Sequence, residues 1–240
     1  MSSGTAVPLK IAPDVAAFDE ATLSSALMTV FRGKFCDTLL RGRSPLRFKA
    51  GDVLYDIGDA SPSMFFIQKG FVKIGTLTHD GREIIYDIRK AGDVVGELCA
   101  VKGARRDRAV ALEPGEAIEV SYTEVTGTLA RQPELLVKLI EVFCNCLADA
   151  YEQITTLTAH DLTERVVHVL LSLASKLGSA GDDPVKIPAY LTQEEISQMV
   201  GARRERVSTT LNVLRRRGLV DYSSRGHLVL HVAALREVAT

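Results

Sequence analysis

Between Pro45 and about Val125, short runs of alternating apolar and polar residues are separated by glycines. The runs include LRFKAGDVLYDIGD and MFFIQKGFVKIGTL, and the glycines between runs are Gly51, Gly58, Gly70, Gly81, Gly92 and Gly96. A period of two is typical of strands with one buried face, and glycine accepts the positive φ of tight turns. HDGRE is a hairpin signal because Asp-Gly fits a two-residue turn. The pattern predicts an antiparallel β-roll or barrel over residues 45–130.

From Pro133 the period changes to that of a helix. Apolar residues recur at alternating spacings of four and three, and they are Leu136, Ile140, Phe143, Leu147, Ala150, Ile154 and Leu157. This is a heptad a/d pattern over three heptads, and it forms a narrower stripe than a helix packed on a globular core usually shows. The pattern favours a parallel two-helix dimer over residues 133–160. A helix packed against its own domain is the alternative.

The remaining residues, 161–240, show the pattern of a winged helix–turn–helix. Asp161 is a plausible N-cap for an amphipathic helix that ends near Leu177, and Thr192 with Glu195 forms a capping box for a second helix. Gly201 then separates this helix from another one, which is helix–turn–helix spacing. The inward-facing apolar residues are expected to be Ile196, Met199, Val200, Val207, Leu211 and Leu214. The following DYSSRGHLVLHV predicts two short strands around a polar turn, which would be a wing.

The second helix of this unit has an unusual charge pattern. Between Gly201 and Gly218 lie one glutamate, Glu205, and six arginines: Arg203, Arg204, Arg206, Arg215, Arg216 and Arg217. A helix dipole favours acids in the first turn, so arginines there need another explanation than a solvated face. Arginine can bond guanine O6 and N7 in the major groove, and glutamate can accept from cytosine N4. Further arginines can hold phosphates, so the pattern predicts sequence-specific binding of duplex DNA.

Composition restricts the classes of protein to which the chain can belong. The chain has 240 residues, 46% of them hydrophobic, with a net charge of −1, so a basic partner-binding surface has to be local. No apolar run reaches the roughly 18 residues of a membrane span, and MSSGTAVPLKIAPDVAAF lacks the features of a signal peptide. The cysteines, Cys36, Cys99, Cys144 and Cys146, form neither a disulfide framework nor a metal-binding cluster. We therefore expect a cytoplasmic protein with no metal, no covalently bound cofactor and no membrane partner.

The stretch GELCAVKGARRDR, residues 96–108, is a candidate pocket for an anion. It starts with a glycine and a carboxylate, and it ends with three arginines around Asp107. Residues 1–44, in contrast, show only a tail and helical stretches such as FDEATLSSALMTVFRGKF.

The order of β-roll, long helix and winged helix–turn–helix resembles the cyclic-AMP receptor protein/fumarate–nitrate regulator (CRP/FNR) family of bacterial transcription regulators. The resemblance covers about residues 45–235 and rests on FKAGDVLYDIGD, FFIQKGFVKI, GDVVGELCAV and LTQEEISQMVGARRERVSTTLNVLRRRGLV. It implies an α+β fold with an N-terminal cyclic-nucleotide-binding-like jelly roll. It also implies an allosteric homodimer on a (pseudo)palindromic duplex site, with RNA polymerase as a candidate partner.

The resemblance also assigns residues to DNA binding. The family carries an Arg-Glu pair at the start of its second helix, which matches Arg204 and Glu205. Ser208 matches a serine of the fumarate–nitrate branch. Thr209 lies where many members have another base-reading arginine. The resemblance therefore implies a GTGA-like element but leaves the rest of the half-site sequence undetermined. The DNA-binding candidates are Thr192, Gln193, Arg203, Arg204, Glu205, Ser208 and Thr209.

In members that bind cyclic nucleotides, the glutamate of GEL bonds the ribose 2′-hydroxyl and a later arginine pairs with the cyclic phosphate. Either Arg105 or Arg106 fits the arginine's place, whereas Ala150 and Tyr151 replace the residues that touch adenine. The effector-binding candidates are Gly96, Glu97, Leu98, Arg105, Arg106, Asp107, Arg108 and Tyr151. The family's iron–sulfur cluster is rejected because only Cys36 lies in the required region, and His79 is a poor haem ligand.

Three effector hypotheses remain. The first is cyclic AMP or cyclic GMP with altered base contacts. The second is cyclic di-GMP, whose phosphates and guanines suit several arginines and a carboxylate. The third is a vestigial pocket that binds no nucleotide, in which Arg105–Asp107 or Arg108–Glu97 are simply salt bridges.

Two other classes of protein are weighed against a DNA-binding regulator. An enzyme regulatory module would need a catalytic constellation, and no P-loop, metal spacing or Ser/His/Asp arrangement is found, so no enzyme activity is expected. An interaction module could act through the coiled coil alone, but it would leave the arginine-rich turn without a role.

Overall fold

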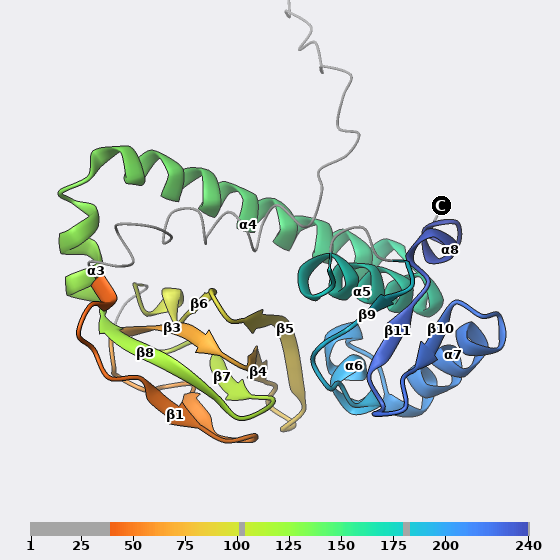
Figure 1. The fold of residues 1–240 in the computed structure, drawn as a ribbon. Coiled ribbons are helices and arrows are strands. Elements are labelled where there is room, and N and C mark those ends of the chain that lie inside the picture. Colours follow the sequence, from red (N-terminus) through yellow and green to blue (C-terminus); the bar gives the residue numbers. More distant parts are fainter. Residues whose placement is uncertain (1–38, 101–103, 180–182, 240) are drawn as a thin grey trace, which may run out of the picture.

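A computed structural model describes residues 39–100, 104–179 and 183–239 (Figure 1). The fold is α+β, as predicted, with a β-roll, a long connecting helix and a winged helix–turn–helix. The helices expected in residues 1–44 lie outside the described residues except for the short segment from Leu39. No helix of the described part of the chain is both long and apolar enough to cross a membrane.

Two antiparallel four-stranded sheets form the roll, in the orders β1-β8-β3-β6 and β2-β7-β4-β5. The elements are β1 (Leu46–Phe48), β2 (Val53–Tyr55), β3 (Ser63–Lys69), β4 (Phe71–Leu77), β5 (Glu83–Lys90), β6 (Val94–Val95), the 3-10 helix η1 (Glu97–Ala100), β7 (Arg108–Ala111) and β8 (Gly115–Ser121). β4 and β5 form the expected hairpin, and Gly81 at its tip has a φ of 78°.

The core of the roll explains why the run MFFI in β3 is apolar throughout. Phe65 and Ile67 belong to the cluster of buried side chains that also holds Tyr55, whereas Met64 and Phe66 belong to a second cluster with helix α3 (Tyr122–Leu129). β3 is therefore buried on both faces, which removes the alternation expected of a half-buried strand.

The strand-like pattern extends to about Val125 in the sequence, and the last strand of the roll, β8, ends at Ser121. α3 begins at Tyr122, because the Ser121 side chain accepts from the backbone N–H of Glu124 while the Glu124 carboxylate reaches back to the Ser121 N–H. This capping box starts a helix at a place where the apolar spacing alone still suits a strand.

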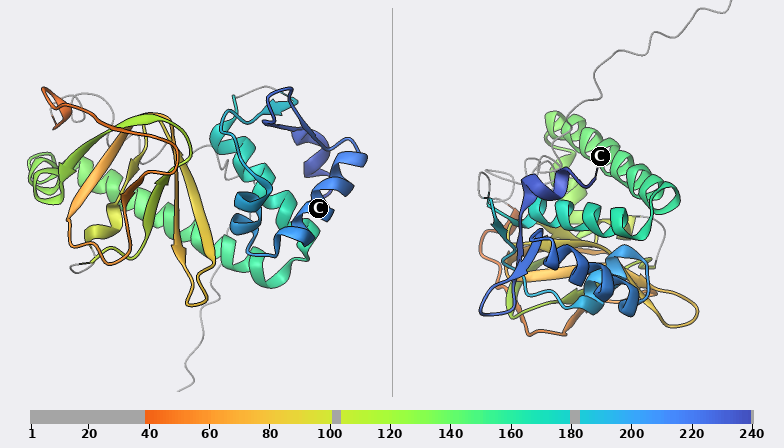
Figure 2. Two further views of the ribbon diagram at one scale, coloured as in Figure 1. Left: turned by 90° about the horizontal axis from the view of Figure 1, so that it is seen from below. Right: turned by 90° about the vertical axis from the view of Figure 1, so that its right-hand side faces the viewer.

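Helix α4 (Pro133–Ala159) runs along the roll from α3 to α5 (Leu162–Leu177), as the views in Figures 1 and 2 show. Its 27 residues correspond to a length of about 40 Å. Pro133 occupies the first turn, where its missing N–H removes no helical hydrogen bond. Asp161 caps α5, as predicted, by accepting from the N–H groups of Thr163 and Glu164.

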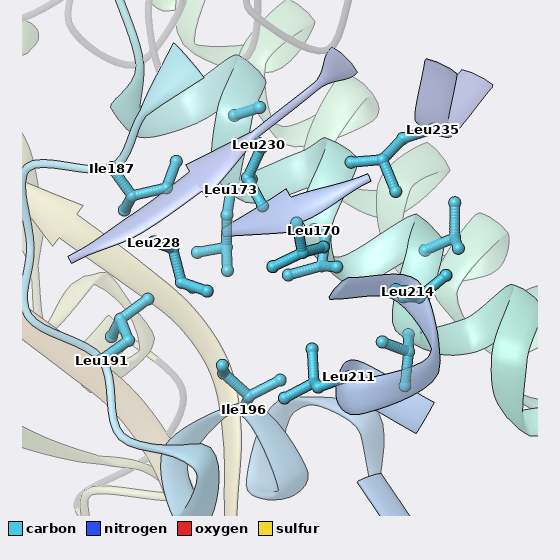
Figure 3. Close-up of a cluster of buried hydrophobic side chains, with 14 of the residues drawn as sticks. Leu170, Leu173, Ile187, Leu191, Ile196, Leu211, Leu214, Leu228, Leu230 and Leu235 are labelled. Atoms are coloured by element: carbon cyan, nitrogen blue, oxygen red, sulfur yellow. The ribbon is translucent and has the colours of Figure 1, made fainter. Parts of the chain in front are cut away.

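Figure 3 shows the core of the winged unit, which belongs to a buried cluster that also includes Ile85 and Ile88 of β5. Its elements are β9 (Val185–Lys186), α6 (Gln193–Val200), α7 (Arg204–Arg216), β10 (Val220–Tyr222), β11 (Leu228–Leu230) and α8 (Val232–Arg236), with the sheet order β10-β11-β9. The inward-facing residues expected in α6 and α7 are buried, except that Met199 is only half-buried. The two predicted wing strands are present, and β9 adds a third that the sequence pattern did not indicate.

Candidate effector pocket and DNA-binding surface

Arg105 lies inside the roll, just before β7, and is only 2% exposed. Its Nη1 donates to the carbonyl oxygen of Gly96 at 3.0 Å, and its Nη2 donates to that of Ser63 at 2.6 Å. The guanidinium carbon lies 4.0 Å from the centre of the Tyr55 ring, a cation–π geometry. Arg105 therefore ties the loop that follows β6 to the start of β3.

Gly96 is required at this place by two independent features. Its φ is +89°, a conformation that side chains with a Cβ rarely adopt. A Cβ at this position would also lie 2.5 Å from Nη1 of Arg105 and 2.9 Å from the carbonyl oxygen of Ser63. A glycine is therefore needed at this position of GEL, because the absence of a Cβ lets Arg105 approach the backbone.

Asp107 is also 2% exposed, and its Oδ2 accepts a hydrogen bond of 2.9 Å from the hydroxyl of Tyr55. Its other oxygen, Oδ1, is buried and has no hydrogen-bond partner among the described residues. Burial raises the pKa of Asp107, and the bond from Tyr55 and the charge of Arg105 offset this only in part. Burial and the carboxylates of Asp107 and Glu97 raise the pKa of Tyr55 well above its usual range.

Glu97 begins η1, and its Oε1 lies 3.4 Å from Nη2 of Arg89 on β5. Burial raises the pKa of Glu97, and the nearby Arg89 counteracts this effect only in part. Glu97 and Asp107 are thus two carboxylates that the fold holds in a poorly solvated environment, each with an arginine nearby.

The other effector candidates lie in different environments. Arg106 and Leu98 are exposed, and Arg108 pairs with Asp56 at 3.3 Å. Tyr151 on α4 is 61% exposed, and its backbone carbonyl accepts a hydrogen bond from Thr155 within the same helix. The structure therefore brings Gly96, Arg105 and Asp107 together, with Glu97 nearby, and does not add Arg106, Leu98 or Tyr151 to them.

The two salt bridges considered for an empty pocket are wrong. Arg108 pairs with Asp56 and Glu97 with Arg89, whereas Arg105 bonds to backbone carbonyls and Asp107 to a tyrosine. Sequence reasoning also missed Tyr55 and Arg89. The available signal for Arg89 was its position two residues after Asp87 in the strand-forming run EIIYDIRK, because residues two apart lie on the same face of a strand.

The helix–turn–helix has the predicted local geometry. The N–H of Glu195 donates to the hydroxyl of Thr192, and Gly201 ends α6 in the left-handed conformation with a φ of 66°. The Thr192 hydroxyl is therefore engaged in the cap, with a further bond of 2.8 Å to the Glu195 carboxylate. Arg203 is the N-cap of α7, and its side chain makes no capping hydrogen bond.

Arg203, Arg204 and Glu205 are exposed at the start of α7. Arg204 lies 4.0 Å from Glu194, a solvent-exposed ion pair of little energetic weight. One turn further along, Ser208 is half-buried and Thr209 is exposed, and the Thr209 hydroxyl donates to the backbone carbonyl of Glu205. The first turn of α7 thus presents two arginines and a glutamate to solvent.

A pocket of about 370 Å³ extends this basic surface toward the roll. Arg203 and Arg206 come from the start of α7, Arg165 comes from α5, and Arg82 comes from the β4–β5 hairpin. Sequence reasoning missed Arg82 and Arg165 because they lie far from the helix–turn–helix in the chain. Among the residues that the structure describes, no group of three or more His, Cys, Asp or Glu could hold a metal ion.

A β-roll joined by a long helix to an arginine-rich winged helix–turn–helix is the architecture of a DNA-binding transcription regulator. Residues 45–132 match the family model of the cyclic nucleotide-binding domain, and residues 164–238 match that of the Crp-like helix-turn-helix domain. The chain belongs to the CRP/FNR family. It is therefore a DNA-binding transcription regulator with a cyclic-nucleotide-binding domain.

Named relatives support this assignment. The chain is 30% identical over 201 residues to the "cAMP-activated global transcriptional regulator Vfr" of Pseudomonas aeruginosa, covering 82% of this chain and 94% of the relative. It is 29% identical over 192 residues to the "CRP-like cAMP-activated global transcriptional regulator" of Mycobacterium tuberculosis, covering 80% and 86%. The solved c-di-GMP responsive global regulator CLP of Xanthomonas campestris has the same fold, with a TM-score of 0.67, 21% identity and coverage of 82% and 97%.

Proposed function

We propose that this chain acts as a homodimer that reads a (pseudo)palindromic duplex through α7 and responds to a cyclic nucleotide bound in the roll. The observation that carries the DNA-binding part is the exposed Arg204–Glu205 pair at the start of α7. Arg204 would bond a guanine and Glu205 a cytosine in the major groove. Arg203 and Arg206 would hold phosphates.

The apolar stripe on α4 supports the dimer. Ile140, Phe143, Leu147, Ile154 and Leu157 are each 50% exposed or more. Large apolar side chains at a/d positions on a helix of this length are stabilised when a second helix covers them. A two-fold dimer would place two copies of α7 about 34 Å apart, one turn of B-DNA.

The DNA-binding proposal is tested with a duplex selected from a random pool and a scrambled duplex of equal length. Arg204→Ala should weaken binding to the selected duplex about 10- to 100-fold, and binding to the scrambled one far less. Arg216→Ala is the matched control, because it removes the same charge from the exposed far end of α7. Equal losses on both duplexes would contradict base reading by Arg204.

The effector part of the proposal rests on the cluster of Gly96, Glu97, Arg105 and Asp107 inside a domain that matches the cyclic-nucleotide family model. Glu97 would bond a ribose hydroxyl. Arg105 would have to exchange its carbonyl bonds for a phosphate, whereas Arg106 is already exposed. Relatives are described as activated by cAMP, and a protein of the same fold as responsive to c-di-GMP, so both nucleotide classes are proposed effectors.

A second candidate is favoured by one observation. Arg105 is 2% exposed, its Nη1 and Nη2 donate to two backbone carbonyls, and its guanidinium stacks on Tyr55, so the protein itself engages both terminal nitrogens and leaves only Nε without a partner among the described residues. The alternative is therefore a DNA-binding regulator whose roll takes no nucleotide.

Calorimetric titration of the purified protein with cyclic di-GMP, cyclic AMP and cyclic GMP separates these candidates. Micromolar binding that is lost in Glu97→Gln and in Arg105→Ala or Arg106→Ala, but kept in Arg47→Ala, would support the pocket. Arg47 is the control because its side chain is 83% exposed on β1. Titrations without heat for all three nucleotides would contradict the effector proposal and favour the second candidate.

A further inference from the structure

A row of ion pairs connects the roll cluster to the winged unit. Nη2 of Arg89 lies 3.4 Å from Oε1 of Glu97, and Nε of Arg89 lies 3.3 Å from Oδ2 of Asp87. The other oxygen of Asp87, Oδ1, lies 3.2 Å from Nζ of Lys176 in the last turn of α5. Asp87 and Arg89 are two residues apart on β5, so the same face of this strand carries both. The row thus runs from Glu97 through β5 to α5.

These side chains are shielded from solvent. Their exposed fractions are 23% for Glu97, 14% for Arg89, 21% for Asp87 and 16% for Lys176, compared with 75% for Arg82 in the surface pair with Asp80. Partly buried pairs are screened less by salt and interact more strongly than surface pairs. Burial by itself would raise the pKa of Asp87, but Arg89 and Lys176 outweigh it and hold that pKa below its usual value.

Further contacts show that β5, which pairs with Glu97 through Arg89, also packs directly against the winged unit. Nζ of Lys90 donates to the backbone carbonyl of Lys176 at 2.5 Å. Ile85 and Ile88 of β5 belong to the same buried cluster as the core of the winged unit. Side chains of β5 are therefore in direct contact with the last turn of α5.

We infer that the Arg89–Asp87 pair transmits the state of Glu97 to α5 through Lys176. This inference rests on the proposed function, in which an effector engages Glu97 and the winged unit binds DNA. An effector hydroxyl bound to Glu97 competes with the Glu97–Arg89 contact. Arg89 then interacts more strongly with Asp87. The ion pair between Asp87 and Lys176 becomes weaker as a result. Two sites are coupled when the ligand of each site changes the equilibrium between the arrangements of such a shared element.

The test is a double-mutant cycle on the full-length protein, without nucleotide or DNA, read by amide hydrogen exchange in the last turn of α5. Glu97→Gln should change the exchange rate there about three-fold or more, because contacting charges usually couple. In the Asp87→Asn background the same substitution should have no effect. In the Lys73→Met background the effect should persist, because Lys73 pairs with Glu83 and Glu195 in a separate contact between roll and winged unit. Melting curves of each variant confirm that the fold is retained.

An unchanged rate in Glu97→Gln would overturn the inference, and so would an equal change in the Asp87→Asn background. A second readout is the Kd for the selected duplex, which should differ from wild type in Asp87→Asn but not in Lys73→Met. An equal change in Kd for both variants would show general loosening of the interface and contradict a specific row. The exchange readout needs neither ligand, so its failure is distinct from a failure to bind nucleotide or DNA.

Discussion

Tyr55→Phe isolates one hydrogen bond in the roll. The substitution removes the hydroxyl that donates to Oδ2 of Asp107 at 2.9 Å and keeps the ring on which Arg105 stacks. Since Oδ1 of Asp107 has no hydrogen-bond partner among the described residues, the variant leaves this carboxylate without any side-chain donor there. Both residues are nearly inaccessible, so water does not readily replace the lost hydroxyl.

The expected loss follows from the charge of the acceptor. A hydrogen bond to a charged group contributes about 1.5–3 kcal/mol, and the penalty for leaving its buried partner unsatisfied is an alternative measure of the same loss, of similar size. We expect the free energy of unfolding to fall by ~2 kcal/mol at pH 7. For a chain of this size that corresponds to a decrease in Tm of ~4–8 °C.

The loss should depend on pH with a definite sign. The pKa of Asp107 is raised by burial in the folded protein, so the folded state binds the proton more tightly than the unfolded chain does. The stability from this preference is fully present below the unfolded pKa of about 3.9 and is lost as the pH rises through the folded pKa. Removing the bond from Tyr55 raises the folded pKa further. Tyr55→Phe should therefore cost more at pH 7 than at pH 4.

Urea unfolding followed by circular dichroism at both pH values measures these differences. Tyr86→Phe is the matched control, because Tyr86 is 45% exposed on β5. The reasoning would be refuted if Tyr55→Phe and Tyr86→Phe had equal stability at pH 7, or if the cost of Tyr55→Phe were the same at both pH values. In an Asp107→Asn background the cost should shrink, because no buried charge remains.

Three further predictions concern other parts of the chain. Gly96→Ala should destabilise the roll by ~1–3 kcal/mol in urea unfolding, because its φ of +89° and its contact with Arg105 exclude a Cβ; wild-type stability would contradict the close approach. Leu211→Ala should lower the stability of the winged unit by ~2–5 kcal/mol, since Leu211 is 1% exposed; a loss below ~1 kcal/mol would count against a packed core there. Phe143→Asp should convert the dimer to a monomer in analytical ultracentrifugation while Glu152→Ala leaves it dimeric, and a dimeric Phe143→Asp would exclude the α4 stripe as the interface.

The caps and turns of the helices could be predicted from the sequence. Asp161 and Thr192 cap helices at the expected positions, and Gly201 ends α6 as predicted. Each of these features depends on residues within four positions along the chain, so local spacing is enough to specify it. The arginines at the start of α7 could be found for the same reason, because neighbours on one helical turn are neighbours in sequence.

The pocket cluster could be predicted only as a set of residues. GEL and RRDR indicated the right loop, but nothing local showed that Arg105 would be buried on Tyr55 while Arg106 stays exposed. β8 ends at Ser121, a few residues before Val125, because a capping box at Ser121 starts α3 there.

Only the tertiary structure decided which charges meet. Tyr55 and Asp107 are 52 positions apart in the chain, and Asp87 and Lys176 are 89 apart. Such contacts exist because two sheets close on each other and a helix packs against β5, and these arrangements depend on the burial of the whole core. A local pattern therefore specifies helices, turns and their exposed charges, whereas the pairing of buried charges depends on how distant segments pack together.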